Sequence, residues 1–117
     1  MNSTEFVEAI KVYVRNAAVE DTKANLERPP GRRVPPDIKK RSIWYNQLPD
    51  ADLEHVHSAI STAVHQALFG FFAVLDGARA IEDGPDKGRL ELIYVGNQRV
   101  LLNDPNNPLH DLFNAAD

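Results

Sequence analysis

The sequence predicts an α+β protein with two main antiparallel helices, a C-terminal β-hairpin with room for a third strand, and a short closing helix. Three observations lead to this prediction. Apolar residues recur every three or four positions over 48–77, which is the period of a helix that faces a core. A weaker stripe of the same period covers residues 3–26. Two strand-like runs, 89–95 and 98–103, flank Gly96-Asn97.

Residues 48–77 are the most apolar part of the chain and predict one long helix. Asp50 is expected to be the N-cap, because its carboxylate can accept hydrogen bonds from the first turn. Gly77 is expected just after the last turn, where glycine adopts a left-handed conformation without steric cost. The last turns, Leu68 to Leu75, are apolar almost all round, so this end is expected in a core or against a partner.

The first helix is predicted over residues 3–26, with Asn2 and Glu5 as a capping box. Its apolar stripe includes Phe6, Ile10 and the pair Tyr13/Val14. We expect this helix to pack antiparallel to the long one, because consecutive helices with short connections usually pair in this way.

Residues 28–41 contain four prolines and six basic residues, with Asp37 as the only acid. Proline restricts itself and the residue before it, so the segment is predicted to be an extended connection inside a single domain, 1–117. A structural interpretation is a solvated linker, and a functional one is a basic arm that contacts nucleic acid or an acidic protein. No aromatic residue lies between the charges to stack on bases, which disfavours nucleic acid.

A short helix is predicted within 37–48, and it carries Trp44 and Tyr45 just before the long helix. These two aromatic residues either anchor an interface or hold the connection against the core. The sequence leaves both interpretations open.

The hairpin is predicted to turn at Gly96-Asn97 as a two-residue primed turn, because the first position accepts a positive φ. Residues 78–82 are a candidate third strand. Near the chain's end, Pro108 is placed at the first position of a short helix. Its apolar residues, which include Leu109 and Phe113, are expected to close the core.

Composition fits one globular domain of 117 residues with a net charge of -4. Residues 1–49 hold nine basic and six acidic side chains, whereas residues 50–117 hold four and eleven. The chain has no cysteine, which excludes disulfides and thiolate sites. The longest apolar run, 67–75, is about half of the roughly 20 residues that span a membrane. We therefore expect a cytoplasmic protein without membrane segments.

Candidate chemistry is sparse. His55, His57 and His65 lie on the long helix, but their spacings do not bring two rings onto one metal ion, so no metal or cofactor is predicted. Carboxylates gather in sequence around the end of this helix, at Asp76, Glu82 and Asp83. With His110 they form an alternative catalytic set for a small hydrolase or a metal-dependent enzyme. The structural interpretation is that these acids cap turns.

Three stretches resemble small bacterial proteins of uncharacterised families over residues 42–113: Trp44-Tyr45-Asn46, 74–77 with 81–83, and 101–104. The resemblance implies no activity. In size and charge the chain is also similar to immunity proteins that neutralise toxins. The leading hypothesis is a non-enzymatic protein-binding module, in which the acids Asp76, Glu82 and Asp83 face a basic partner and Trp44 and Tyr45 are anchors.

Self-association is a further expectation. The apolar end of the long helix and a hairpin that is apolar on both faces exceed what a small core covers. We therefore predict a homodimer with Phe69 or Phe72 near the centre of its interface.

Overall fold

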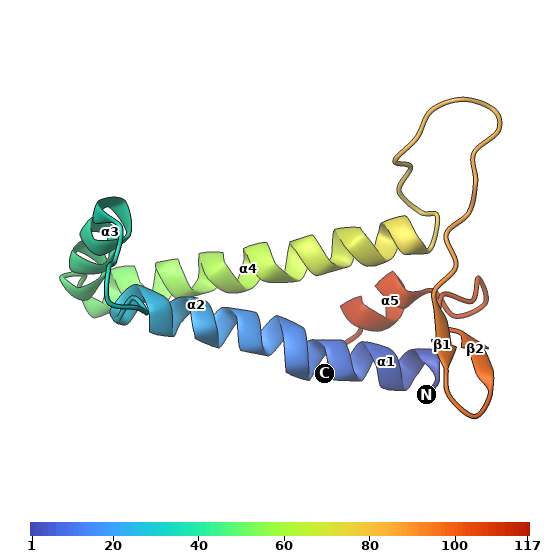
Figure 1. Ribbon diagram of the computed structural model, residues 1–117, viewed down its shortest axis with the longest axis horizontal. Helices are drawn as coiled ribbons and strands as arrows, with labels where there is room; N and C mark the ends of the chain where they lie inside the picture. The colour runs from blue at the N-terminus through green and yellow to red at the C-terminus, as the bar shows by residue number, and fades with distance from the viewer. The chain divides into compact units, whose positions relative to one another are not determined.

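The structure, a computed structural model, describes all residues, 1–117, and has the predicted α+β fold. Its elements are α1 (Ser3–Ile10), the π-helical segment η1 (Lys11–Asn16), α2 (Ala17–Glu27), α3 (Pro36–Asn46), α4 (Asp50–Leu75), β1 (Ile93–Val95), β2 (Arg99–Leu101) and α5 (Leu109–Asn114) (Figure 1). The sheet consists of β1 and β2 in antiparallel pairing. The third strand considered for 78–82 is absent.

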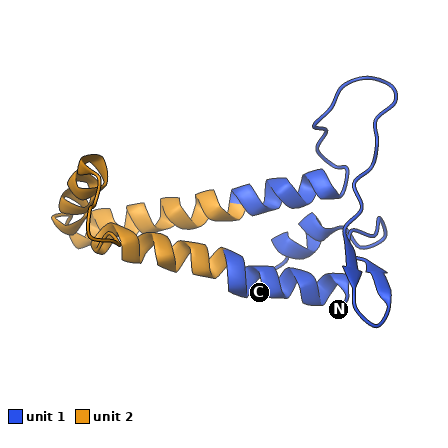
Figure 2. Cartoon of the chain, in the orientation of Figure 1, with its two compact units in different colours: residues 1–14, 66–117 blue, residues 15–65 orange.

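The chain divides into two compact units (Figure 2). Unit 1 comprises residues 1–14 and 66–117, and unit 2 comprises residues 15–65. The hairpin, α1, α5 and the last turns of α4 belong to unit 1. The helices α2 and α3 and the first turns of α4 belong to unit 2. That the whole chain forms one domain stays a prediction.

Four buried apolar side chains from α1, α4 and α5 form the core of unit 1: Val7, Phe72, Leu109 and Phe113. The Phe72 ring lies 5.2 Å from that of Phe113, between centroids, and meets Phe6 edge-on at 6.1 Å. Burying each such side chain contributes about 1.5–3 kcal/mol. Figure 1 shows α5 between α1 and the end of α4. The short helix therefore closes the core, as predicted.

The predicted first helix is continuous from Ser3 to Glu27 but contains the π-helical segment η1. The capping box at its start is confirmed, since Glu5 N donates to Asn2 Oδ1 and Asn2 N donates to Glu5 Oε1. The expected apolar stripe does not continue through η1, where Tyr13 is 78% exposed. A π turn holds more residues than an α turn, so it rotates the residues within it away from the α-helical stripe.

The start of α4 lies one residue away from the predicted cap. Asp50 is already helical, and the carbonyl oxygen of Pro49 accepts from Asp52 N and Leu53 N, each at 3.0 Å. The prediction of Asp50 as N-cap is therefore wrong. Its carboxylate still lies in the first turn, where negative charge is favourable.

The end of α4 is a Schellman motif at Gly77. Ala78 N donates to Ala73 O at 2.8 Å, and Gly77 N donates to Val74 O at 3.1 Å. Gly77 has a φ of +76°, so the predicted left-handed glycine is confirmed.

The hairpin turn differs from the prediction. Val95 pairs with Arg99, which leaves a three-residue loop, 96–98, in place of a two-residue turn. Primed turns need positive φ values, and neither Gly96 nor the rest of this loop has one. The hairpin loop therefore closes without the positive φ that was expected at Gly96.

One buried amide, that of Asn103, joins the hairpin to the end of α4. Its side chain accepts from Leu92 N at 2.8 Å and donates to Leu75 O at 2.7 Å and to Leu90 O at 2.8 Å. We call these three hydrogen bonds the Asn103 clamp. The clamp satisfies polar groups that burial would otherwise leave unpaired, and it holds both ends of the loop between α4 and β1.

In unit 2, α3 begins at Pro36, so only the first part of the predicted extended connection, 28–35, is non-helical. Proline is compatible with the first helical position because its missing N–H has no intrahelical partner there. The helix predicted within 37–48 is confirmed. Ser42 Oγ and Asn46 Nδ2 donate to Glu27 O at 3.3 Å and 3.0 Å, which ties α3 to the end of α2.

By length and composition alone, α4 could cross a membrane, with a mean hydropathy of 1.5 over its most apolar window. Only 17% of that window is buried in the structure. Core helices of soluble proteins pass the same test. A cytoplasmic location and the absence of a membrane segment therefore stay predictions.

Candidate functional site

The two aromatic candidates on α3 have different environments. Tyr45 is buried, at 8% exposure, and its hydroxyl lies 2.8 Å from His57 Nε2 on the first part of α4. Trp44 is 51% exposed, and the neighbouring Ile43 is 52% exposed. Successive residues of a helix point about 100° apart, so adjacent side chains take different faces. Tyr45 therefore holds α3 against α4 within unit 2, while Trp44 offers a large apolar surface to solvent.

A groove of about 520 Å³ lies in unit 2, and we call it the basic groove. It is lined by Pro29, Arg32, Arg33, Val34, Lys39, Ser42 and Ile43. The connection supplies one wall, and α3 supplies the other through residues one turn apart, such as Lys39 and Ile43. None of the three cations forms an ion pair with a carboxylate of the chain. Positive charge thus gathers there without internal compensation.

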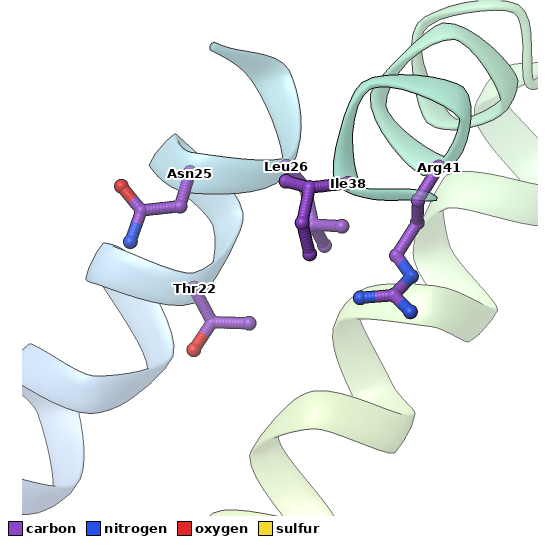
Figure 3. A pocket seen from close by; sticks show the side chains of 5 residues that line it. All are labelled: Thr22, Asn25, Leu26, Ile38 and Arg41. Carbon is purple, nitrogen blue, oxygen red and sulfur yellow. The ribbon is translucent and has the colours of Figure 1, made fainter. Parts of the chain in front are cut away.

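The contact between α2 and α3 positions this groove. A smaller pocket of about 200 Å³ lies at that contact, and both Leu26 of α2 and Ile38 of α3 are in its lining (Figure 3). Thr22, Asn25 and Arg41 complete its lining. The hydrogen bonds of Ser42 and Asn46 to Glu27 O keep α3 against α2. The α3 side of the basic groove therefore belongs to a packed pair of helices.

Asp76 and His110, two members of the alternative catalytic set, do come together in unit 1. Asp76 Oδ2 accepts from His110 N at 2.8 Å and lies 2.5 Å from His110 Nδ1. The Asp76 side chain is 5% exposed, and its other oxygen, Oδ1, is buried without a partner. Phe69 packs edge-on against the imidazole with 5.7 Å between centroids. The carboxylate therefore caps the first turn of α5 and orients the His110 ring.

The other members of that set lie elsewhere. Glu82 and Asp83 are exposed in the loop after α4, and Glu82 Oε1 accepts from Gly88 N at 2.7 Å. No hydrogen bond or ion pair connects either acid to His110, whose second ring nitrogen lies 3.4 Å from Asp111 Oδ1. No three His, Asp or Glu side chains are grouped to hold a metal ion. The predicted acidic residues therefore do not form one site. Asp76 caps α5, and Glu82 forms a hydrogen bond within the loop after α4.

The residues predicted at a self-association interface belong largely to the core. Phe72 is 3% exposed among Val7, Leu109 and Phe113, so it has little surface for a partner. Phe69 is half-buried against the same core and His110. The exposed phenylalanine at this end of α4 is Phe71, at 60%.

Sequence reasoning missed the basic groove as a concave site, although it singled out the charges of 28–41 and Trp44. A usable signal is the spacing of Lys39 and Ile43 with Lys40 and Trp44, which places two cation–apolar pairs on neighbouring stripes of one helix.

No protein family, no curated protein and no solved structure matches this chain. The resemblance to small bacterial proteins therefore stays a prediction.

Proposed function

We propose that the protein is a non-enzymatic protein-binding module whose binding surface in unit 2 consists of Trp44, Ile43 and the basic groove. The observation that supports this proposal most directly is a groove lined by Ile43 and three cations without carboxylate partners, on the helix that also carries the 51% exposed Trp44. Tryptophan and arginine are the residues most enriched among those that dominate binding energy at protein interfaces.

The chemistry of the groove favours a partner segment that carries carboxylates next to large apolar side chains. Arg32, Arg33 and Lys39 attract the carboxylates, and Pro29, Val34 and Ile43 offer apolar contact between the charges. Bidentate pairing suits arginine and carboxylate in particular. The proposed partner at this surface is thus acidic, whereas the sequence led us to expect a basic partner facing Asp76, Glu82 and Asp83.

Two other readings have less support. Proteins that bind single-stranded nucleic acid combine a basic groove with aromatic side chains along it, and the basic groove has no aromatic residue in its lining, with Trp44 the one exposed aromatic residue of α3. In a hydrolase based on Asp76 and His110, the imidazole would act as a general base through a free ring nitrogen, whereas Nδ1 lies 2.5 Å from Asp76 Oδ2 and Nε2 lies 3.4 Å from Asp111 Oδ1. Toxin neutralisation is one form of the protein-binding proposal, and it rests on the similarity in size and charge to immunity proteins.

Trp44 provides the test, because it is the only tryptophan of the chain. Its emission is followed during titration with a short peptide that alternates glutamate and leucine. A matched lysine–leucine peptide and oligo-dT are titrated in parallel. We expect the acidic peptide to change the emission saturably at low salt, and added salt to weaken its binding.

The double variant Arg33→Gln/Lys39→Gln should bind the acidic peptide about tenfold more weakly, because two exposed charge pairs are lost. Its circular dichroism should match the wild type. The control Lys23→Gln/Arg99→Gln also removes one lysine and one arginine, and it should bind like the wild type. Tighter binding of oligo-dT than of the peptide, or equal binding by both variants, would overturn the proposal.

A further inference from the structure

The loop between α4 and β1 is long but anchored at both ends. Residues 76–89 leave the end of α4 and return at Leu90 without forming a helix or strand (Figure 1). The Asn103 clamp bonds the carbonyl oxygens of Leu75 and Leu90, at 2.7 Å and 2.8 Å, so the ends of the loop lie together. Compact loops with adjacent ends of this kind are frequently functional.

This loop carries a second groove, which we call the loop groove, of about 470 Å³ in unit 1. Residues 50–117 contain four basic side chains, and three of them, Arg79, Lys87 and Arg89, line it. Of the loop's acids, Asp83 and Asp86 are not in the lining. Glu82 is in the lining, but its Oε1 accepts a hydrogen bond from Gly88 N. The loop therefore concentrates cations on the groove within an acidic half of the chain.

The guanidinium of Arg79 lies against α4 at Gly70, which has no side chain. A Cβ atom at Gly70 would collide with the Arg79 guanidinium. Glycine in a helix interior lowers helix stability relative to alanine. Gly70 therefore destabilises α4 locally, but it leaves the space that the Arg79 guanidinium occupies. Arg79 has no carboxylate partner, whereas Arg89 is paired with Glu91 at 2.8 Å. Arg79 is thus a positioned guanidinium whose donors are not used by an acid of the chain.

We propose that the loop groove binds a small amphipathic anion, a carboxylate on a short alkyl or aryl body. Arg79 and Lys87 hold the carboxylate through charge-assisted hydrogen bonds. Ile81 and Leu90, 70% and 46% exposed, cover the apolar body. A volume of about 470 Å³ lies in the range of small-ligand sites. This site lies in unit 1 and does not depend on the proposed protein-binding function.

The test is an NMR titration of the ¹⁵N-labelled full chain with octanoate, octanol and inorganic phosphate. We expect octanoate to shift the amide signals of Gly70, Gly77 and Gly88 saturably, and to bind at least about tenfold more tightly than either other probe. Octanol lacks the charge and phosphate lacks the apolar body. Equal binding of octanol would overturn the role of the cations, and equal binding of phosphate would overturn the apolar part.

Arg79→Gln should weaken octanoate binding about tenfold. Arg99→Gln removes the one basic residue of this half that lies outside the groove, and it should leave binding unchanged. Gly70→Ala displaces the guanidinium while keeping its charge, so it should also weaken binding. Equal octanoate affinity of Arg79→Gln and Arg99→Gln, or no shift at any of the three glycines, would refute the site.

Discussion

At the scale of single residues, Gly77 has the clearest conformational requirement. Its φ of +76° lies in the left-handed region, and both hydrogen bonds of the Schellman motif depend on that geometry. A Cβ atom added there would meet no atom within 4 Å. Any effect of a side chain at this position therefore comes from the backbone conformation and not from crowding.

Gly77→Ala should lower the free energy of unfolding by about 1 kcal/mol, because alanine is strained at a positive φ that glycine adopts freely. Urea unfolding followed by circular dichroism measures the difference. Gly88→Ala is the matched control, since Gly88 has no positive φ and its added Cβ would lie 3.7 Å from Glu82 Oε1, an ordinary contact. Equal stability of the two variants would contradict the prediction.

The same scale shows where sequence reasoning stops. The Gly77 cap and the Asn2 capping box were predictable because each depends on neighbours within a few positions. Local sequence could not show which of Trp44 and Tyr45 is buried and which is exposed. Tyr45 is buried by its contact with His57, which lies twelve positions further along the chain, and local sequence does not encode that contact.

At the scale of elements, Asp76 connects the end of α4 to the start of α5. The carboxylate accepts from His110 N in the first turn of α5, a helix that supplies Leu109 and Phe113 to the core. A short helix of this kind is stabilised mainly by its contacts, so its cap influences the whole of unit 1. The role of Asp76 is therefore expected to be visible in stability.

Asp76→Ala should reduce the free energy of unfolding by about 1–2 kcal/mol, because α5 loses its N-terminal acceptor. Thermal unfolding followed by circular dichroism provides the measurement. Asp111→Ala is the control, since the Asp111 side chain is 72% exposed, and it should change stability by less than about 0.5 kcal/mol. An unchanged midpoint for Asp76→Ala would show that the cap has no structural importance.

Element types were more predictable than their ends and pairings. Long periodic runs identified the first helix, α3 and α4, because helix periodicity is a local property. The third strand failed because residues 78–82 leave α4 through its C-terminal cap, where Ala78 N and Arg79 N both donate to Ala73 O, and continue as an irregular loop. The concave shape of the basic groove was not predictable. Its walls come from the connection and from α3, and the positions of the charges in the sequence do not show how these two segments pack.

At the scale of the whole molecule, much apolar surface is unburied. Large apolar side chains such as Tyr13, Phe71 and Val95 are 78%, 60% and 65% exposed, and only 17% of the most apolar window of α4 is buried. Soluble monomers rarely leave large contiguous apolar patches exposed, and two-fold dimers commonly bury them. We therefore keep the prediction of a homodimer but move its expected contact from Phe69 or Phe72 to Phe71.

Phe71→Glu should shift the protein from dimer to monomer without unfolding it, because the charge would be buried unpaired only in the interface. Light scattering over a range of concentrations gives the mass, and circular dichroism reports folding. Phe72→Glu places the same charge in the core and should unfold unit 1. A wild-type protein that remains at 13.1 kDa across the whole range would disprove self-association.

The Asn103 clamp also affects how this chain can change in evolution. Because the clamp holds Leu75 and Leu90 together, residues between them can vary in number while the hairpin and α4 keep their places. Doubling the length of a flexible loop costs only about 0.6 kcal/mol in closure entropy. Insertions and deletions are therefore expected to accumulate between these two residues in descendants of this sequence. The same segment is a natural position for displaying a foreign peptide, with both of its ends fixed by a single asparagine.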